Sequence, residues 1–182
     1  MGRLTLIGGG ARSGKSAFGL RLARSTGARR LFVATAQARD TEMAARIDRH
    51  RRDRGADFLT VEAPIELARA VAAATDVDVV VIDCLTLWLS NLLALDLAEA
   101  EILARIDGLV AAASGRSFTT IVVSNEVGMG IVPPTPLGRV FRDLTGLAHQ
   151  RLAAAADEIY CAMLGTIVRL RPSALEVTGS TR

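Results

Sequence analysis

The segment from Gly9 to Ser16 constrains the fold more than any other part of this sequence. It reads Gly-Gly-Ala-Arg-Ser-Gly-Lys-Ser and fits the pattern G-x-x-x-x-G-K-[ST]. An apolar run over residues 3–8 precedes it, and residues 15–24 follow it with helical spacing. Glycines let the backbone curl so that successive N–H groups point at phosphate oxygens, and the following helix adds the positive end of its dipole. The pattern therefore predicts a strand, a phosphate-binding loop and a helix.

Each residue of this loop is a candidate contact to a nucleoside triphosphate: Gly9, Gly10, Ala11, Arg12, Ser13, Gly14, Lys15 and Ser16. Lys15 is expected to reach the β- and γ-phosphates, and the Ser16 hydroxyl to ligate Mg²⁺. Composition supports the first assignment, because Lys15 is the only lysine among 22 basic residues. A compact ammonium suits this position among phosphates, and a planar guanidinium is a poor replacement.

The rest of the chain predicts an α/β domain. Continuous apolar, β-branched runs at residues 77–82 and 120–123 are typical of central parallel strands buried on both faces. Further strands are expected at 31–34, 159–163 and 166–170, and helices after Asp40, from Pro64 to about Ala74, at 97–113 and at 138–156. This alternation predicts the P-loop NTPase fold, a mostly parallel sheet with helices on both faces, in one domain over residues 1–182. Residues 171–182 are expected to form a loose tail.

Asp83 follows the apolar run at residues 77–82, at the expected end of a strand. A carboxylate in this position holds Mg²⁺ directly or through water in many enzymes that transfer phosphoryl groups. We therefore predict that Ser16 and Asp83 are metal ligands. A polar residue that merely ends a strand is the alternative.

Two histidines are candidates for chemistry. His50 lies on an arginine-rich helix, four residues from Arg46 and seven from Met43, so it borders the apolar face of that helix. Spacing alone favours a solvated basic face over a catalytic role. His149 lies in another expected helix and is interpreted as a surface or capping group.

Composition limits the partners. The net charge of +3 suits an anionic small ligand but is too weak and scattered for nucleic acid. Cys84 and Cys161 form no metal-ligand cluster with the histidines and are expected to be reduced thiols. No apolar run approaches the roughly 20 residues that cross a membrane, and the first residues do not read as a signal peptide, so a cytoplasmic location is expected.

Several stretches, in order along nearly the whole chain, resemble one family. They are residues 9–16 (GGARSGKS), 33–37 (VATAQ), 42–47 (EMAARI) with His50, 124–133 (SNEVGMGIVP) and 150–158 (QRLAAAADE). The sequence resembles the bifunctional adenosylcobinamide kinases/adenosylcobinamide-phosphate guanylyltransferases of cobalamin biosynthesis. The segments around 125–133 and 43–50 carry the resemblance most specifically, because the phosphate-loop pattern is shared by many families.

The resemblance implies two reactions. ATP or GTP phosphorylates the aminopropanol hydroxyl of adenosylcobinamide, and GMP from GTP is then transferred to adenosylcobinamide phosphate through a GMP-histidine intermediate. The histidine of the family matches His50, which makes His50 and Lys15 the candidate catalytic residues. Besides the phosphate loop, the nucleotide contacts of the family map onto Ala34, Thr35, Ala36, Arg51, Arg52, Asp53, Arg54, Glu62 and Asp83. The family also implies a homotrimer.

Two other functions stay open on the sequence alone. A different small-molecule P-loop kinase needs no nucleophilic histidine, and a non-catalytic nucleotide-binding regulator turns nothing over. The segment over residues 125–136 is expected to be a mobile lid over the corrinoid.

Overall fold

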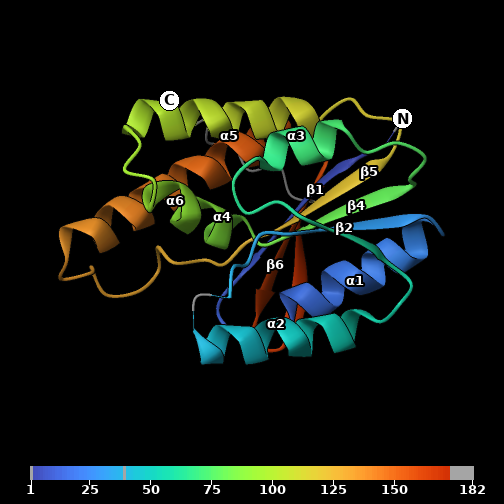
Figure 1. Cartoon of the computed structure of the whole chain (residues 1–182), viewed down its shortest axis with the longest axis horizontal. Coiled ribbons are helices and arrows are strands. Elements are labelled where there is room, and N and C mark those ends of the chain that lie inside the picture. Colours follow the sequence, from blue (N-terminus) through green and yellow to red (C-terminus); the bar gives the residue numbers. More distant parts are fainter. Residues whose placement is uncertain (1, 39, 173–182) are drawn as a thin grey trace.

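The computed structural model describes residues 2–38 and 40–172, and within them the chain forms a seven-stranded sheet (Figure 1). The strand order is β3-β2-β4-β5-β1-β6-β7. Neighbouring strands are parallel except β6 and β7, which are antiparallel. The strands are β1 (Leu4–Gly9), β2 (Arg30–Ala34), β3 (Leu59–Glu62), β4 (Val79–Asp83), β5 (Thr119–Val123), β6 (Glu158–Met163) and β7 (Thr166–Arg171).

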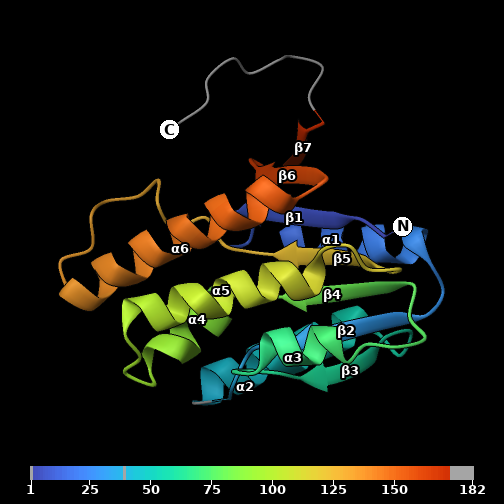
Figure 2. The same cartoon turned by 90° about the horizontal axis from the view of Figure 1, so that it is seen from above.

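Helices cover both faces of this sheet, as Figures 1 and 2 show. Helices α1 (Lys15–Thr26) and α2 (Thr41–Arg54) lie on one face. The other face carries α3 (Leu67–Ala72), α4 (Leu85–Leu93), α5 (Glu99–Ala113) and α6 (Pro136–Ala155). None of these described helices is long and apolar enough to span a bilayer.

The β-branched run of β4 explains why both faces need a cover. Val80 and Ile82 belong to the apolar cluster formed with α3 to α6, whereas Val79 and Val81 belong to the cluster formed with α1. Successive side chains of a strand point to opposite faces, so a continuous apolar run is buried only between two layers of helices. The parallel strands bring their carboxyl ends to one edge of the sheet, where the loops after β1, β2, β4 and β5 meet.

Most expected elements are present, with four differences. Helix α3 begins at Leu67 and not at Pro64, because the preceding carbonyls serve tertiary contacts: Asn91 Nδ2 donates to Pro64 O (3.1 Å) and Trp88 Nε1 to Ile65 O (2.8 Å). Strand β3 and helix α4 were not predicted. Arg171 belongs to β7, and the rest of the expected tail, from residue 173, lies outside the described residues.

Candidate active site

The phosphate loop connects β1 to α1 at the carboxyl edge of the sheet. Its first and last glycines, Gly9 (φ 153°) and Gly14 (φ 89°), have positive φ angles that side chains rarely allow. At Gly9 there is no space for a side chain either, because a Cβ atom would lie 2.5 Å from Ala162 O of β6. Glycine is therefore required where the loop leaves the sheet.

Lys15 begins α1 and folds its side chain back into this loop. Its Nζ donates to Gly10 O at 3.0 Å, and the residue is buried. Burial lowers the pKa of Lys15, while the nearby Asp83 carboxylate opposes the shift. The Ser13 Oγ atom of the same loop is buried and has no hydrogen-bond partner in the described part of the chain. A buried ammonium and an unsatisfied hydroxyl in a glycine loop fit the binding of phosphate oxygens.

Asp83 ends β4 beside Ser16. Burial raises the pKa of Asp83, and a hydrogen bond from the Ser16 side chain, with the nearby His50 and Lys15, acts in the opposite direction. No group of three or more His, Cys, Asp or Glu side chains within residues 2–38 and 40–172 is arranged to hold a metal alone. One hydroxyl and one carboxylate are still a suitable protein donor set for Mg²⁺, which takes its other ligands from phosphates and water.

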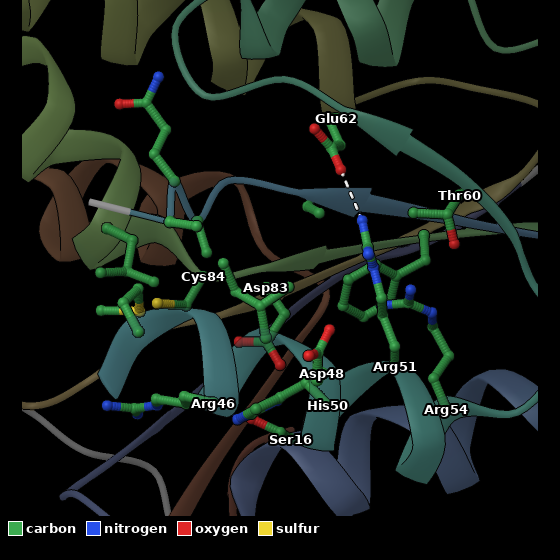
Figure 3. A pocket seen from close by; sticks show the side chains of 18 of the residues that line it. Ser16, Arg46, Asp48, His50, Arg51, Arg54, Thr60, Glu62, Asp83 and Cys84 are labelled. Atoms are coloured by element: carbon green, nitrogen blue, oxygen red, sulfur yellow. Dashed lines mark hydrogen bonds and ion pairs between the residues drawn. The ribbon is translucent and has the colours of Figure 1, made fainter. Parts of the chain in front are cut away.

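A cavity of about 390 Å³ extends from these residues across the carboxyl edge of the sheet. Figure 3 shows the Asp83 carboxylate among Ser16, Arg46 and His50, with Arg51, Glu62 and Thr60 farther along the cavity. Of the residues predicted from the sequence, nine line it: Lys15, Ser16, Ala34, Ala36, His50, Arg51, Arg54, Glu62 and Asp83.

Helix α2 brings His50 to this cavity. The Asp40 side chain caps the helix by accepting from Met43 N at 2.7 Å, as expected from the sequence. Met43, Ile47 and His50 are partly buried and line the cavity, which agrees with their spacing along one face. His50 is therefore placed beside the Asp83 carboxylate.

Two arginines near the end of α2 are held in different ways. Arg54 is buried, and its guanidinium carbon lies 4.1 Å from the centre of the Phe32 ring. Burial lowers the pKa of Arg54. Arg51 pairs with Glu62 of β3 at 2.9 Å, and both side chains are exposed. An exposed pair of this kind contributes little to stability and is easily rearranged by a ligand.

Other predicted contacts lie elsewhere. Arg52 and Asp53 are exposed and do not belong to the lining of the cavity. The Thr35 side chain is fully buried and bonded to the backbone of Cys84, so its hydroxyl is not directed at a ligand. The loop residues before Lys15 do not line this cavity either. One of them, Ala11, lines a second cavity beside it.

The sequence reasoning missed Phe32, Thr60 and Cys84 as lining residues. Phe32 and Cys84 flank predicted positions on β2 and β4, so their neighbours along the strands were the available signal. Thr60 lies on β3, which was not predicted. The interpretation of His149 as a surface or capping group was wrong: its side chain is largely buried, and its Nε2 lies 2.7 Å from Ser124 Oγ. The reason is that α6 packs this side chain against the end of β5.

Comparison with known proteins decides among the remaining interpretations. The family model described as cobinamide kinase / cobinamide phosphate guanyltransferase matches residues 5–170. The chain belongs to this family. The predicted family and enzyme class are thereby confirmed. The predicted P-loop NTPase fold is confirmed by the mostly parallel sheet between two layers of helices and by its likeness to a solved structure.

Relatives of this family member match along almost their whole length. The bifunctional adenosylcobalamin biosynthesis protein CobU of Escherichia coli (strain K12) is 38% identical over 181 residues, which cover 92% of this chain and 99% of the relative. The protein CobP of Pseudomonas aeruginosa is 39% identical over 171 residues, or 91% and 96% of the two chains. Among solved structures, the RadB recombinase aligns with a TM-score of 0.55 at 17% identity, over 95% of this chain and 84% of RadB, which shows the fold alone.

Proposed function

We propose that this chain phosphorylates adenosylcobinamide with ATP or GTP and then transfers GMP from GTP to the new phosphate, with His50 as the covalent carrier. One observation supports this assignment above all. A single cavity is lined by four groups: the Lys15 ammonium, the Ser16 hydroxyl, the Asp83 carboxylate and the His50 imidazole. A simple kinase has use for the first three of these groups but none for the fourth.

In the first reaction, the acceptor hydroxyl oxygen bonds to the γ-phosphorus and the nucleoside diphosphate leaves with the β–γ bridging oxygen. Lys15 neutralises the phosphate charge, and the backbone N–H groups of the loop hold the oxygens. Mg²⁺, when bound, would withdraw charge from the β- and γ-phosphates, and Ser16 and Asp83 are the residues that would hold it.

In the second reaction, a neutral imidazole nitrogen of His50 attacks the α-phosphorus of GTP, and pyrophosphate leaves. An oxygen of the cobinamide phosphate then attacks the same phosphorus, and the bond to His50 breaks. Arg46, one helical turn before His50, lines the same cavity with Arg51 and Arg54. These three cations can stabilise the charge that builds up on the phosphoryl oxygens.

The resemblance supports further parts of the proposal. We propose Mg²⁺ as the metal, a homotrimer as the assembly, the cytoplasm as the location and residues 1–182 as one domain. Of the nucleotide contacts that the family implies, we propose the eight that line the cavity beside His50, together with the loop backbone from Gly9 to Gly14.

The covalent intermediate provides the test. Wild-type protein is incubated with GTP radiolabelled at the α-phosphate, denatured and assayed for retained label. We expect an acid-labile, base-stable adduct that His50→Ala lacks, while the variant still phosphorylates the cobinamide hydroxyl. His149→Ala is the matched control, and we expect it to keep the adduct.

Other outcomes separate the alternatives. A label that persists in His50→Ala contradicts the assignment of the nucleophile. Turnover without any adduct in the wild type favours another small-molecule kinase, and binding without turnover favours a regulator.

A further inference from the structure

A second cavity of about 300 Å³ adjoins the first. The two cavities share three lining residues: Arg46, Leu87 and Asn125. The second cavity is otherwise bounded by the phosphate loop, α4, the segment after β5 and α6, through Ala11, Thr86, Ser90, Glu126, Val127 and Phe141. It therefore lies beside the phosphate loop and next to the cavity that Lys15 lines.

The chain after β5 is fastened to the strand that leads into the phosphate loop. Ser124 N donates to Ile7 O and Glu126 N donates to Gly9 O, both at 2.9 Å. Gly9 is the first residue of the phosphate-loop pattern. The backbone of Glu126 thus has a fixed position relative to the phosphate-binding groups.

Both oxygens of the Glu126 carboxylate have neighbours within the protein. One oxygen accepts from Gly128 N, and the other lies 3.7 Å from His149 Nδ1. The other ring nitrogen of His149, Nε2, lies 2.7 Å from Ser124 Oγ. Burial lowers the pKa of His149 and favours a neutral ring.

Ser124, His149 and Glu126 lie in the serine, histidine, carboxylate order known from hydrolases. The burial of Ser124 excludes it as a nucleophile. Ser124 is fully buried and is absent from the lining of both cavities. Glu126 is the member that reaches a cavity, with a side chain 30% exposed. The carboxylate is thus the group that can meet a substrate, and the imidazole supports it.

The remaining lining suits a short aliphatic alcohol. Leu87, Val127 and Phe141 supply apolar surface, and Asn125 Nδ2 donates to Thr86 Oγ1 at 2.8 Å. Asp83 lines only the first cavity, beside Ser16. The carboxylate nearest to an acceptor in the second cavity is therefore Glu126.

Building on the proposed function, we infer that the second cavity receives the hydroxyl end of the acceptor and that Glu126 is the general base of the kinase reaction. As the hydroxyl oxygen bonds to the γ-phosphorus and the β–γ bridging oxygen departs, the hydroxyl proton passes to Glu126, which releases it to water. His149 is a positioning residue that keeps the carboxylate aimed at the hydroxyl.

The two reactions of the enzyme make this inference testable. Guanylyl transfer uses an acceptor phosphate that is already ionised, so it needs no base for the acceptor. We expect Glu126→Gln to lower kcat of cobinamide phosphorylation on the order of 100-fold or more. KM for the nucleotide and the rate of guanylyl transfer to preformed cobinamide phosphate should stay close to those of the wild type. The rate of guanylyl transfer also reports whether Glu126→Gln is folded.

Conservative and matched variants complete the experiment. Glu126→Asp should recover part of the lost kcat, and Glu101→Gln, an exposed change on α5, should alter neither reaction. His149→Asn should lower kinase kcat on the order of tenfold in the wild type and cause no further loss in Glu126→Gln, because the two residues act as one unit.

Three other outcomes contradict the inference. Wild-type kinase turnover in Glu126→Gln, or an equal loss of both reactions, excludes Glu126 as the base. If the losses of kinase kcat in His149→Asn and Glu126→Gln are fully additive in the double variant, the positioning role of His149 is excluded. Failure of the wild type to catalyse either reaction would instead refute the proposed function, so the two failures are distinguishable.

Discussion

The Thr35 hydroxyl is hydrogen-bonded to both backbone groups of Cys84: it donates to the carbonyl oxygen and accepts from the amide nitrogen, at 2.8 Å each. These bonds join the end of β2 to the residue after Asp83. All of these groups are buried or nearly so. The position of the Asp83 carboxylate thus depends on the side chain that directly follows the neighbouring strand.

Thr35→Val is expected to destabilise the fold and to disturb Asp83. The substitution keeps the shape of the side chain but leaves the buried N–H of Cys84 without a partner, at a cost of about 1–3 kcal/mol. The Cys84 carbonyl oxygen still accepts from Trp88 N at 3.3 Å. Thr35→Ser keeps the hydroxyl and is the matched control. Chemical denaturation should show a much larger loss of unfolding free energy for Thr35→Val than for Thr35→Ser. Equal losses in the two variants would contradict the role assigned to the hydroxyl.

Lys15→Ala is expected to abolish both reactions, because both use the same triphosphate cradle. We expect no fall in melting temperature, since the variant removes a buried ammonium whose pKa is lowered by burial. Lys15→Arg keeps the charge but not the compact shape, and it should also be severely impaired. Separate assays of phosphorylation and guanylyl transfer check this prediction, and near-normal guanylyl transfer would refute the shared cradle.

Asp83→Asn is expected to weaken the magnesium dependence of turnover without weakening the fold. Burial raises the pKa of Asp83, so the folded state binds this proton more tightly than the unfolded chain. The stability contributed by this group is complete below the unfolded pKa of about 3.9 and is lost as pH rises through the folded value. The stability of Asp83→Asn should not fall in this way as pH rises. Magnesium titrations and melting temperatures across this pH range test both statements.

Asp78 should show the opposite pH dependence. Its carboxylate accepts from the Arg29 guanidinium and from the backbone N–H groups of Arg29 and Ala28, which lowers its pKa to about 2. Its contribution to stability is present above the unfolded pKa of about 3.9 and is lost as pH falls toward the folded value. In Asp78→Asn this acid-induced loss should become shallower, whereas Asp143→Asn, an exposed change beside Arg142, should leave it unchanged. Unfolding measured by circular dichroism from pH 7 downward is the check.

Local pattern was sufficient for the elements that carry the phosphate chemistry. The glycines around Lys15 predicted the loop, and the β-branched run before Asp83 predicted a strand buried on both faces. Helix α4 (Leu85–Leu93) was missed because it is apolar on most sides, and a short run of that kind is ambiguous between a buried helix and a strand. Strand β3 was missed because it is short and largely exposed.

Side-chain direction was less predictable than position. The resemblance placed Thr35 among the nucleotide contacts, but its hydroxyl is directed by the backbone of Cys84, which is 49 residues away in sequence. His149 is likewise buried by contacts with Ser124 and Glu126 after a different strand. Such contacts depend on which strands become neighbours, and no short stretch of sequence contains that information.

The burial of Lys15 in the phosphate loop has a practical consequence for limited proteolysis. A protease specific for lysine has one cleavage site in this sequence, the bond between Lys15 and Ser16. That bond lies at the start of α1, with the lysine side chain held against Gly10 O. Cleavage therefore requires local opening of the loop, and its rate measures how often the loop opens. A single-cut digestion followed over time would report directly on nucleotide occupancy, with no label and no engineered site.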